Sequence, residues 1–177
     1  MADRIRKKTK YLTVSAMLCA LGTVCLMLGA LIDVLDITVS VLASLFCLYA
    51  VIEIGGAYPW GIYAATSILS LVLLPVKTPA LFYAAFAGFY PILKQHVERL
   101  PKLPMYLLKL LIFHASFGII ALAFRLFLSE ELQSDSFFWL PLLLYLASLL
   151  TFCLYDLALS RVITFYRIRL HSRFRIK

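Results

Sequence analysis

Six apolar runs dominate the sequence, and most of them are long enough to cross a membrane as a helix. They cover residues 11–32, 37–54, 58–74, 79–93, 105–128 and 136–157. A spanning helix needs about 20 predominantly apolar residues. Of the 177 residues, 63% are hydrophobic and 15% are charged, whereas an average soluble domain is about 45–50% apolar and about 25% charged. We therefore predict an all-α polytopic protein, a single membrane domain of six helices over residues 1–177. The composition excludes a soluble enzyme, a disordered chain and a disulfide-framed secreted module.

The basic residues indicate how these helices are oriented. Lysine and arginine near the ends of spans favour the cytoplasmic side. Fifteen of the 17 Lys and Arg residues fall in the N-terminal tail (1–10), between residues 94 and 109, or in the C-terminal tail (158–177). These three regions share one side of a six-span arrangement, and the loops of the opposite side are acidic. We expect both termini to be cytoplasmic in a bacterial inner membrane. The net charge of +8 then indicates orientation and anionic lipid at the basic tails rather than nucleic acid.

Ionisable residues at membrane depth are costly and therefore functional candidates. In the fifth run, His114 and Arg125 lie on one helical stripe together with Gly118 and Ala121. The small residues leave room for a solute beside His114, with Arg125 near the outer mouth. In the alternative interpretation the stripe is a packed surface, with His114 bonded to a backbone carbonyl and Arg125 reaching outward.

More polar candidates lie at the predicted outer ends of the spans. Lys77 follows the third run, and Asp33 and Asp36 follow the first. Lys77 and Arg125 are expected either to pair with these carboxylates or to hold an anionic group of a solute. Tyr83 in the fourth run is a candidate for stacking on a flat ligand, and its alternative role is that of an aromatic anchor at the interface.

No catalytic or metal-binding motif accompanies these residues. The chain has no HExxH, GxSxG or GxxxxGK[ST] sequence, and its three histidines lie on separate segments. The four cysteines lie inside apolar runs and have the character of small packing residues. We therefore predict no enzymatic activity, no cofactor and no metal site.

The first run, KYLTVSAMLCALGTV, carries small residues at its cytoplasmic end. With six spans and a basic N-terminus, it resembles the substrate-binding S components of energy-coupling factor (ECF) transporters. In that family, small residues at four-residue spacing in the first helix contact the transmembrane coupling subunit. Ala16 and Ala20 match this pattern, and the third position of the wider motif is Val24 here.

The resemblance implies a function and partners. Such a subunit captures a small vitamin-like solute from outside and docks on a coupling subunit that carries two ATPases. Its pocket is expected among Asp33, Asp36, Lys77, Tyr83, His114 and Arg125. The alternatives are a six-span scaffold of cell-envelope assembly, which resembles the rod-shape determining membrane subunit and needs no polar outer cavity, and a stand-alone secondary carrier, for which the sequence lacks internal repeats.

Overall fold

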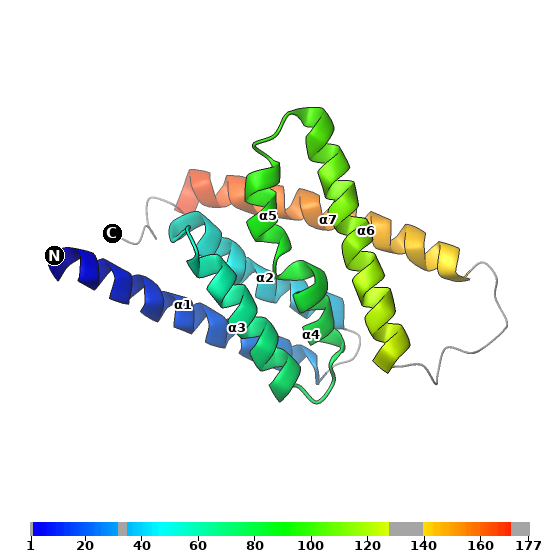
Figure 1. Cartoon of the computed structure of the whole chain (residues 1–177), viewed down its shortest axis with the longest axis horizontal. Helices are drawn as coiled ribbons and strands as arrows, with labels where there is room; N and C mark the ends of the chain where they lie inside the picture. Colours follow the sequence, from blue (N-terminus) through cyan, green and yellow to red (C-terminus); the bar gives the residue numbers. More distant parts are fainter. Residues whose placement is uncertain (1, 32–34, 128–139, 171–177) are drawn as a thin grey trace. The chain divides into compact units, whose positions relative to one another are not determined.

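The computed structural model describes residues 2–31, 35–127 and 140–170, and all regular elements in these ranges are helical (Figure 1). The predicted all-α class is therefore confirmed for the described residues. The helices are α1 (Ala2–Gly29), α2 (Asp36–Glu53), α3 (Tyr58–Leu73), α4 (Thr78–Phe82), α5 (Tyr90–Val97), α6 (Lys102–Phe127) and α7 (Leu140–Phe165). Two π-helical turns complete them, η2 (Tyr83–Ala87) and η3 (Tyr166–Leu170).

Four helices are long and apolar enough to cross a membrane. The apolar stretches are Ile5–Gly29, Asp36–Glu53, Lys102–Ala123 and Leu142–Phe165. These stretches correspond to the predicted first, second, fifth and sixth spans. The third predicted span is also an apolar helix, α3, but it has only 16 residues. A helix of this length is slightly shorter than the usual range for a full span.

The fourth predicted span differs most from expectation. Instead of one helix over residues 79–93, the chain forms α4, the π-helical turn η2 and then α5. Pro91 explains the break, because it has no N–H to donate and its ring clashes with the preceding turn of a continuous helix. Pro91 stands in the first turn of α5, where the missing donor costs nothing. The Gly88 N–H bonds to the Tyr83 carbonyl at 2.8 Å, five residues back, as a π turn requires.

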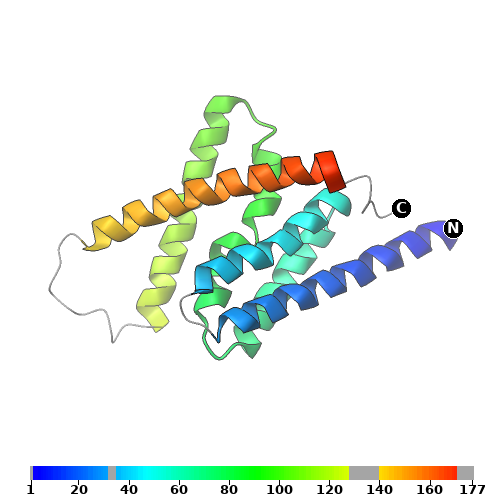
Figure 2. The same cartoon turned by 180° about the vertical axis from the view of Figure 1, so that it is seen from behind.

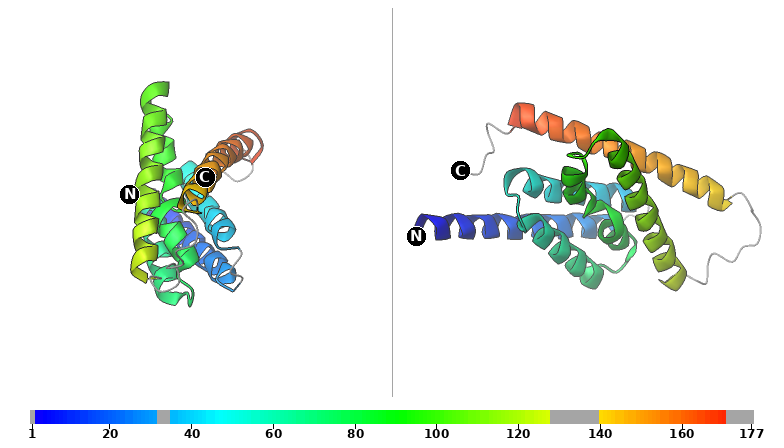
Figure 3. Two further views of the ribbon diagram at one scale, coloured as in Figure 1. Left: turned by 90° about the vertical axis from the view of Figure 1, so that its right-hand side faces the viewer. Right: turned by 45° about the horizontal axis from the view of Figure 1, so that its top comes forward.

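The basic ends of the chain are also more helical than the span boundaries suggest. α1 begins at Ala2, so the basic segment up to residue 10 continues the first helix. Lysine and arginine are good helix formers, and the first turns of α1 project beyond the ends of α2 and α3 (Figures 1 and 3). At the other end, α7 continues to Phe165 and is followed by η3. The described part of the C-terminal tail is therefore helical.

The chain divides into two compact units, residues 1–109 and 110–177. In the first unit α1 lies alongside α2 (Figure 2) and also packs on α3. Leu18 and Cys19 of α1 meet Ala50 of α2 and Ile62 of α3 in one buried cluster. After α2, the chain turns through Gly55 and Gly56, whose φ angles of 66° and 64° are accessible to glycine at little cost.

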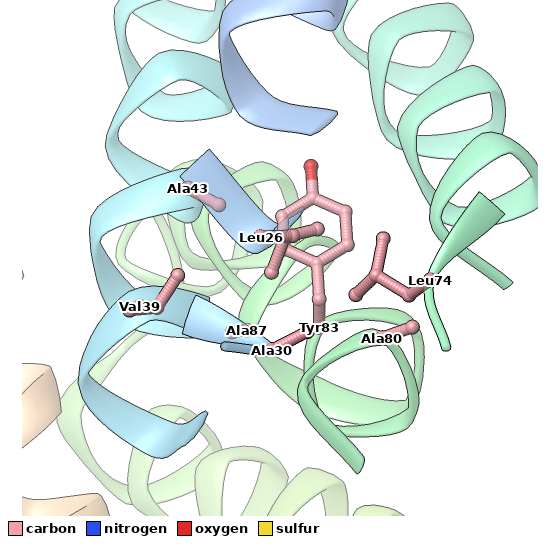
Figure 4. Close-up of a cluster of buried hydrophobic side chains, with 8 residues drawn as sticks. All are labelled: Leu26, Ala30, Val39, Ala43, Leu74, Ala80, Tyr83 and Ala87. Atoms are coloured by element: carbon pink, nitrogen blue, oxygen red, sulfur yellow. The ribbon is translucent and has the colours of Figure 1, made fainter. Parts of the chain in front are cut away.

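A second buried cluster of the first unit surrounds the broken fourth span. It is built from α1, α2, α4, η2 and the residues that directly follow α1 and α3, and it contains Leu26, Ala30, Val39, Ala43, Leu74, Ala80, Tyr83 and Ala87 (Figure 4). Gly88 lies where no side chain fits, because an added Cβ would approach Tyr63 Cδ2 to 2.7 Å and Tyr83 Cε1 to 2.8 Å. The Tyr63 hydroxyl donates to the Ala84 carbonyl of η2 at 2.7 Å, which satisfies a backbone group of the π turn.

The second unit begins at Leu110 within α6 and includes α7. Phe113 of α6 packs against Tyr145 and Phe152 of α7, with ring centroids 6.1 and 5.2 Å apart. The leucines on the outer faces of both helices are exposed, for example Leu122 and Leu150. Exposed apolar faces along helices of this length are typical of lipid or partner contact.

Candidate functional site

An apolar groove runs between α1 and α3 in the first unit. The two helices are parallel at this point, since Tyr11 packs edge-on against Tyr58 with centroids 5.8 Å apart and Gly22, further along α1, lies against Thr66. The groove has a volume of about 570 Å³. It is lined by Leu12, Ser15, Ala16, Cys19, Ala20, Ala57, Tyr58, Gly61, Ile62, Ala65 and Leu69.

Small residues from both helices create this groove. On α1, Ala16 and Ala20 are one turn apart and exposed. Across from them, Gly61 and Ala65 are also one turn apart on α3. A Cβ added to Gly61 would meet no atom within 4 Å, so the groove is open above this residue. Small residues at four-residue spacing let a second helix backbone approach closely.

The two predicted docking residues, Ala16 and Ala20, thus lie on a concave surface, although the docking itself stays a prediction. Sequence reasoning missed the α3 side of the groove. The signal was present, because Ala57, Gly61 and Ala65 follow one another at four-residue spacing.

The chemistry of the groove suits an apolar occupant. All but Ser15 and Tyr58 of the lining residues are apolar. The Ser15 hydroxyl is buried and has no hydrogen-bond partner among the described residues. The groove offers no charged group that would orient a polar solute, and a small-molecule site normally carries a few well-placed polar groups. The groove is therefore a surface of small apolar residues, open on the side away from α1 and α3.

The predicted solute-binding residues are distributed over both units. In the first unit, Asp36 begins α2 and Lys77 precedes α4. The Ser40 hydroxyl holds these two ends together, since it lies 2.7 Å from the Asp36 carbonyl and 2.9 Å from the Pro79 carbonyl. The Lys77 ammonium group is exposed and donates to the Leu74 carbonyl at 2.6 Å. Asp33 lies outside the described residues.

Tyr83 does not present its ring to an open cavity. Its side chain is 1% exposed and lies beside Leu26 and Leu74 in the core of the first unit (Figure 4). It also packs against Tyr63, with ring centroids 6.3 Å apart. The ring is therefore enclosed in the core of the first unit, and its role towards a ligand stays a prediction.

His114 and Arg125 belong to the second unit. His114 Nδ1 lies 2.8 Å from the Leu110 carbonyl, and Nε2 lies 2.9 Å from the Tyr145 hydroxyl. Because a carbonyl only accepts, Nδ1 carries a proton and donates to Leu110, and Nε2 shares a hydrogen bond with the Tyr145 hydroxyl. The contact with a backbone carbonyl matches one part of the packed-stripe alternative, but His114, Gly118 and Ala121 are all exposed, so the stripe is not packed against the described residues. Arg125 is part of α6, but its side chain lies outside the described residues.

In the described ranges no three His, Cys, Asp or Glu side chains gather as metal ligands. No protein family, curated protein or solved structure matches the chain.

Proposed function

We propose that the protein is a membrane-embedded subunit that docks on a separate membrane protein through the groove between α1 and α3. The single observation that carries this proposal is that small residues on two parallel helices leave an open apolar groove at Ala16, Ala20, Gly61 and Ala65. In membranes, close backbone approach is a main source of helix–helix affinity, and the first unit presents this surface to a partner rather than filling it.

We propose further that the subunit belongs to an ECF-type importer and captures a small micronutrient-like solute for a coupling subunit and its ATPases. Ala16 and Ala20 match the four-residue spacing of small residues that the resemblance to this family implies for docking. Asp36 and Lys77 begin α2 and precede α4, at the end of the unit opposite to the basic N-terminal turns of α1. With cytoplasmic termini in a bacterial inner membrane, these two residues would face outward and contribute to the solute site.

The second candidate is a six-span scaffold of envelope assembly that binds proteins only. Two observations favour it. Tyr83 is buried in the core, and the groove is lined almost entirely by apolar residues. Both candidates require the docking groove, so they differ only in whether a solute binds at the predicted outer end.

One experiment tests docking on a partner and binding of a solute independently. We would extract the tagged protein from its own membrane in mild detergent and record native mass spectra of the wild type and of Ala20→Trp. The indole fills the groove from α1. The control is Ala64→Trp, because Ala64 is exposed on α3 but does not line the groove.

The proposal expects the partner subunits to be lost from Ala20→Trp and retained by Ala64→Trp. A retained small molecule in both variants, together with ATPase subunits in the wild type, supports the importer. Envelope-assembly proteins without a small molecule support the scaffold. An unchanged partner in Ala20→Trp contradicts docking through this groove.

A further inference from the structure

A buried ion-pair cluster joins α5 to the start of α6. The Lys94 ammonium group lies 2.7 Å from Glu98 Oε1, and its side chain is 0% exposed. Lys109 of α6 approaches the same oxygen at 3.8 Å, with 11% of its side chain exposed. One carboxylate, 39% exposed, thus faces two ammonium groups. Charges buried to this degree are expensive unless they are paired or serve a purpose.

The surroundings of this cluster add positive charge. Arg99 and Lys102 lie between the two buried lysines and are exposed. The segment 94–109 therefore carries four cations and a single carboxylate. α2 adds one more acidic residue at this end of the unit, Glu53, which is its last residue. Two residues before it, Val51 packs against Ile92 of α5. Even with Glu53 included, this end of the unit has an excess of two positive charges.

An apolar surface adjoins these cations. Leu103, Tyr106 and Leu107 lie on the first turns of α6 and are 78%, 65% and 63% exposed. The apolar stretch Lys102–Ala123 of α6 begins at the same point. Cations therefore lie where a spanning helix enters the bilayer, next to leucines that acyl chains can cover. Tyrosine at this depth is typical of the headgroup region.

We propose that the α5–α6 junction binds the phosphate group of an anionic phospholipid, with Arg99 and Lys102 as the headgroup ligands. Arginine and lysine bind phosphate through charge-assisted hydrogen bonds, and basic groups at helix ends bind such headgroups. Glu98 pairs with the two buried lysines, Lys94 and Lys109, whereas Arg99 and Lys102 are exposed. The exposed leucines select a lipid over free phosphate, because inorganic phosphate has no chain to cover them. This inference rests on the proposed membrane-spanning arrangement and not on docking or solute binding.

The test measures lipid binding to the isolated full-length protein. Native mass spectrometry in detergent, with increasing phosphatidylglycerol, gives the dissociation constant of the first bound lipid. The test variant is Arg99→Gln/Lys102→Gln, whose positions are exposed, so that the fold is preserved. The matched control is Arg6→Gln/Lys8→Gln, which removes the same charge from exposed turns of α1. Phosphatidylcholine and inorganic phosphate serve as the other ligands.

We expect the test variant to bind phosphatidylglycerol about thirtyfold more weakly, since each cation near an anionic headgroup contributes about fivefold. The control variant should change binding by less than about threefold. Equal losses in the test and control variants, or equal binding of phosphatidylcholine, would overturn the proposal. Inorganic phosphate that displaces the lipid at equal concentration would overturn the assignment to a lipid.

Discussion

Replacing Gly88 with alanine tests the packing around the broken fourth span. Gly88 has φ −73° and ψ −41°, which any residue adopts in a right-handed helix. Its role is therefore purely steric. A Cβ at this position would lie 2.7 Å from Tyr63 Cδ2 and 2.8 and 2.9 Å from Tyr83 Cε1 and Cζ. Favourable carbon–carbon contacts lie at about 3.5–4.0 Å, so both rings must move.

The expected change in the free energy of unfolding of Gly88→Ala follows from two opposing effects. Overpacking a filled core costs about 1–3 kcal/mol, and three contacts this short, against rings that are held in the core, favour the upper end. Replacing glycine by alanine in a helix gains about 1 kcal/mol. The net effect of Gly88→Ala is a loss of about 2 kcal/mol in the free energy of unfolding. At Gly61, where an added Cβ meets nothing within 4 Å, the same substitution should gain about 1 kcal/mol.

The assay is unfolding of the purified protein in mixed micelles by increasing sodium dodecyl sulfate, followed by tryptophan fluorescence. Trp60 reports directly on this region, because its ring lies 6.1 Å from that of Tyr63. Gly88→Ala should unfold at a lower fraction of sodium dodecyl sulfate than the wild type, and Gly61→Ala at an equal or higher fraction. The reasoning is refuted if the two variants unfold together or if Gly88→Ala is the more stable one.

Two further predictions concern polar contacts. Glu98→Gln removes the carboxylate from the buried ammonium group of Lys94 and should lower the free energy of unfolding by about 1.5–2 kcal/mol, because hydrogen bonds to charged groups contribute about 1.5–3 kcal/mol. The same unfolding titration measures this loss, and an unchanged midpoint would contradict it. Tyr145→Phe removes the bond to His114 and should cost only about 0.6 kcal/mol, as is usual between membrane helices. A loss above about 2 kcal/mol in that titration would show that the pair does more than join α6 to α7.

The apolar runs predicted the helices well because length and hydropathy are local properties. The runs at 37–54 and 58–74 match α2 and α3 to within a residue or two. The ends of α1 and α7 were harder to predict. Hydropathy indicates where the apolar stretch of a helix ends, whereas the helix itself continues as far as its backbone hydrogen bonds do. Lysine and arginine are hydrophilic but are also good helix formers, so α1 extends back to Ala2.

The candidate site was only partly predictable, since a site depends on which faces meet. The small residues of α1 could be identified from the sequence. The small residues of α3 that line the other side of the groove could have been found from the same four-residue spacing. The burial of Tyr83 could not be predicted from the sequence, because it depends on which elements pack around it, here α1, α2 and α4. Lys94 was expected among the cytoplasmic cations, and its burial depends on the packing of α5 against α2.

The most direct test of the docking surface is site-specific photo-crosslinking in the native membrane. A photoreactive phenylalanine at Gly61 projects from the groove, and the same residue at Val72, which is 73% exposed on α3 and does not line the groove, serves as the control. The account predicts a discrete adduct with one integral membrane protein from position 61 and none from position 72. Lipid adducts alone at both positions, or the same protein adduct at both, would contradict docking through the groove between α1 and α3.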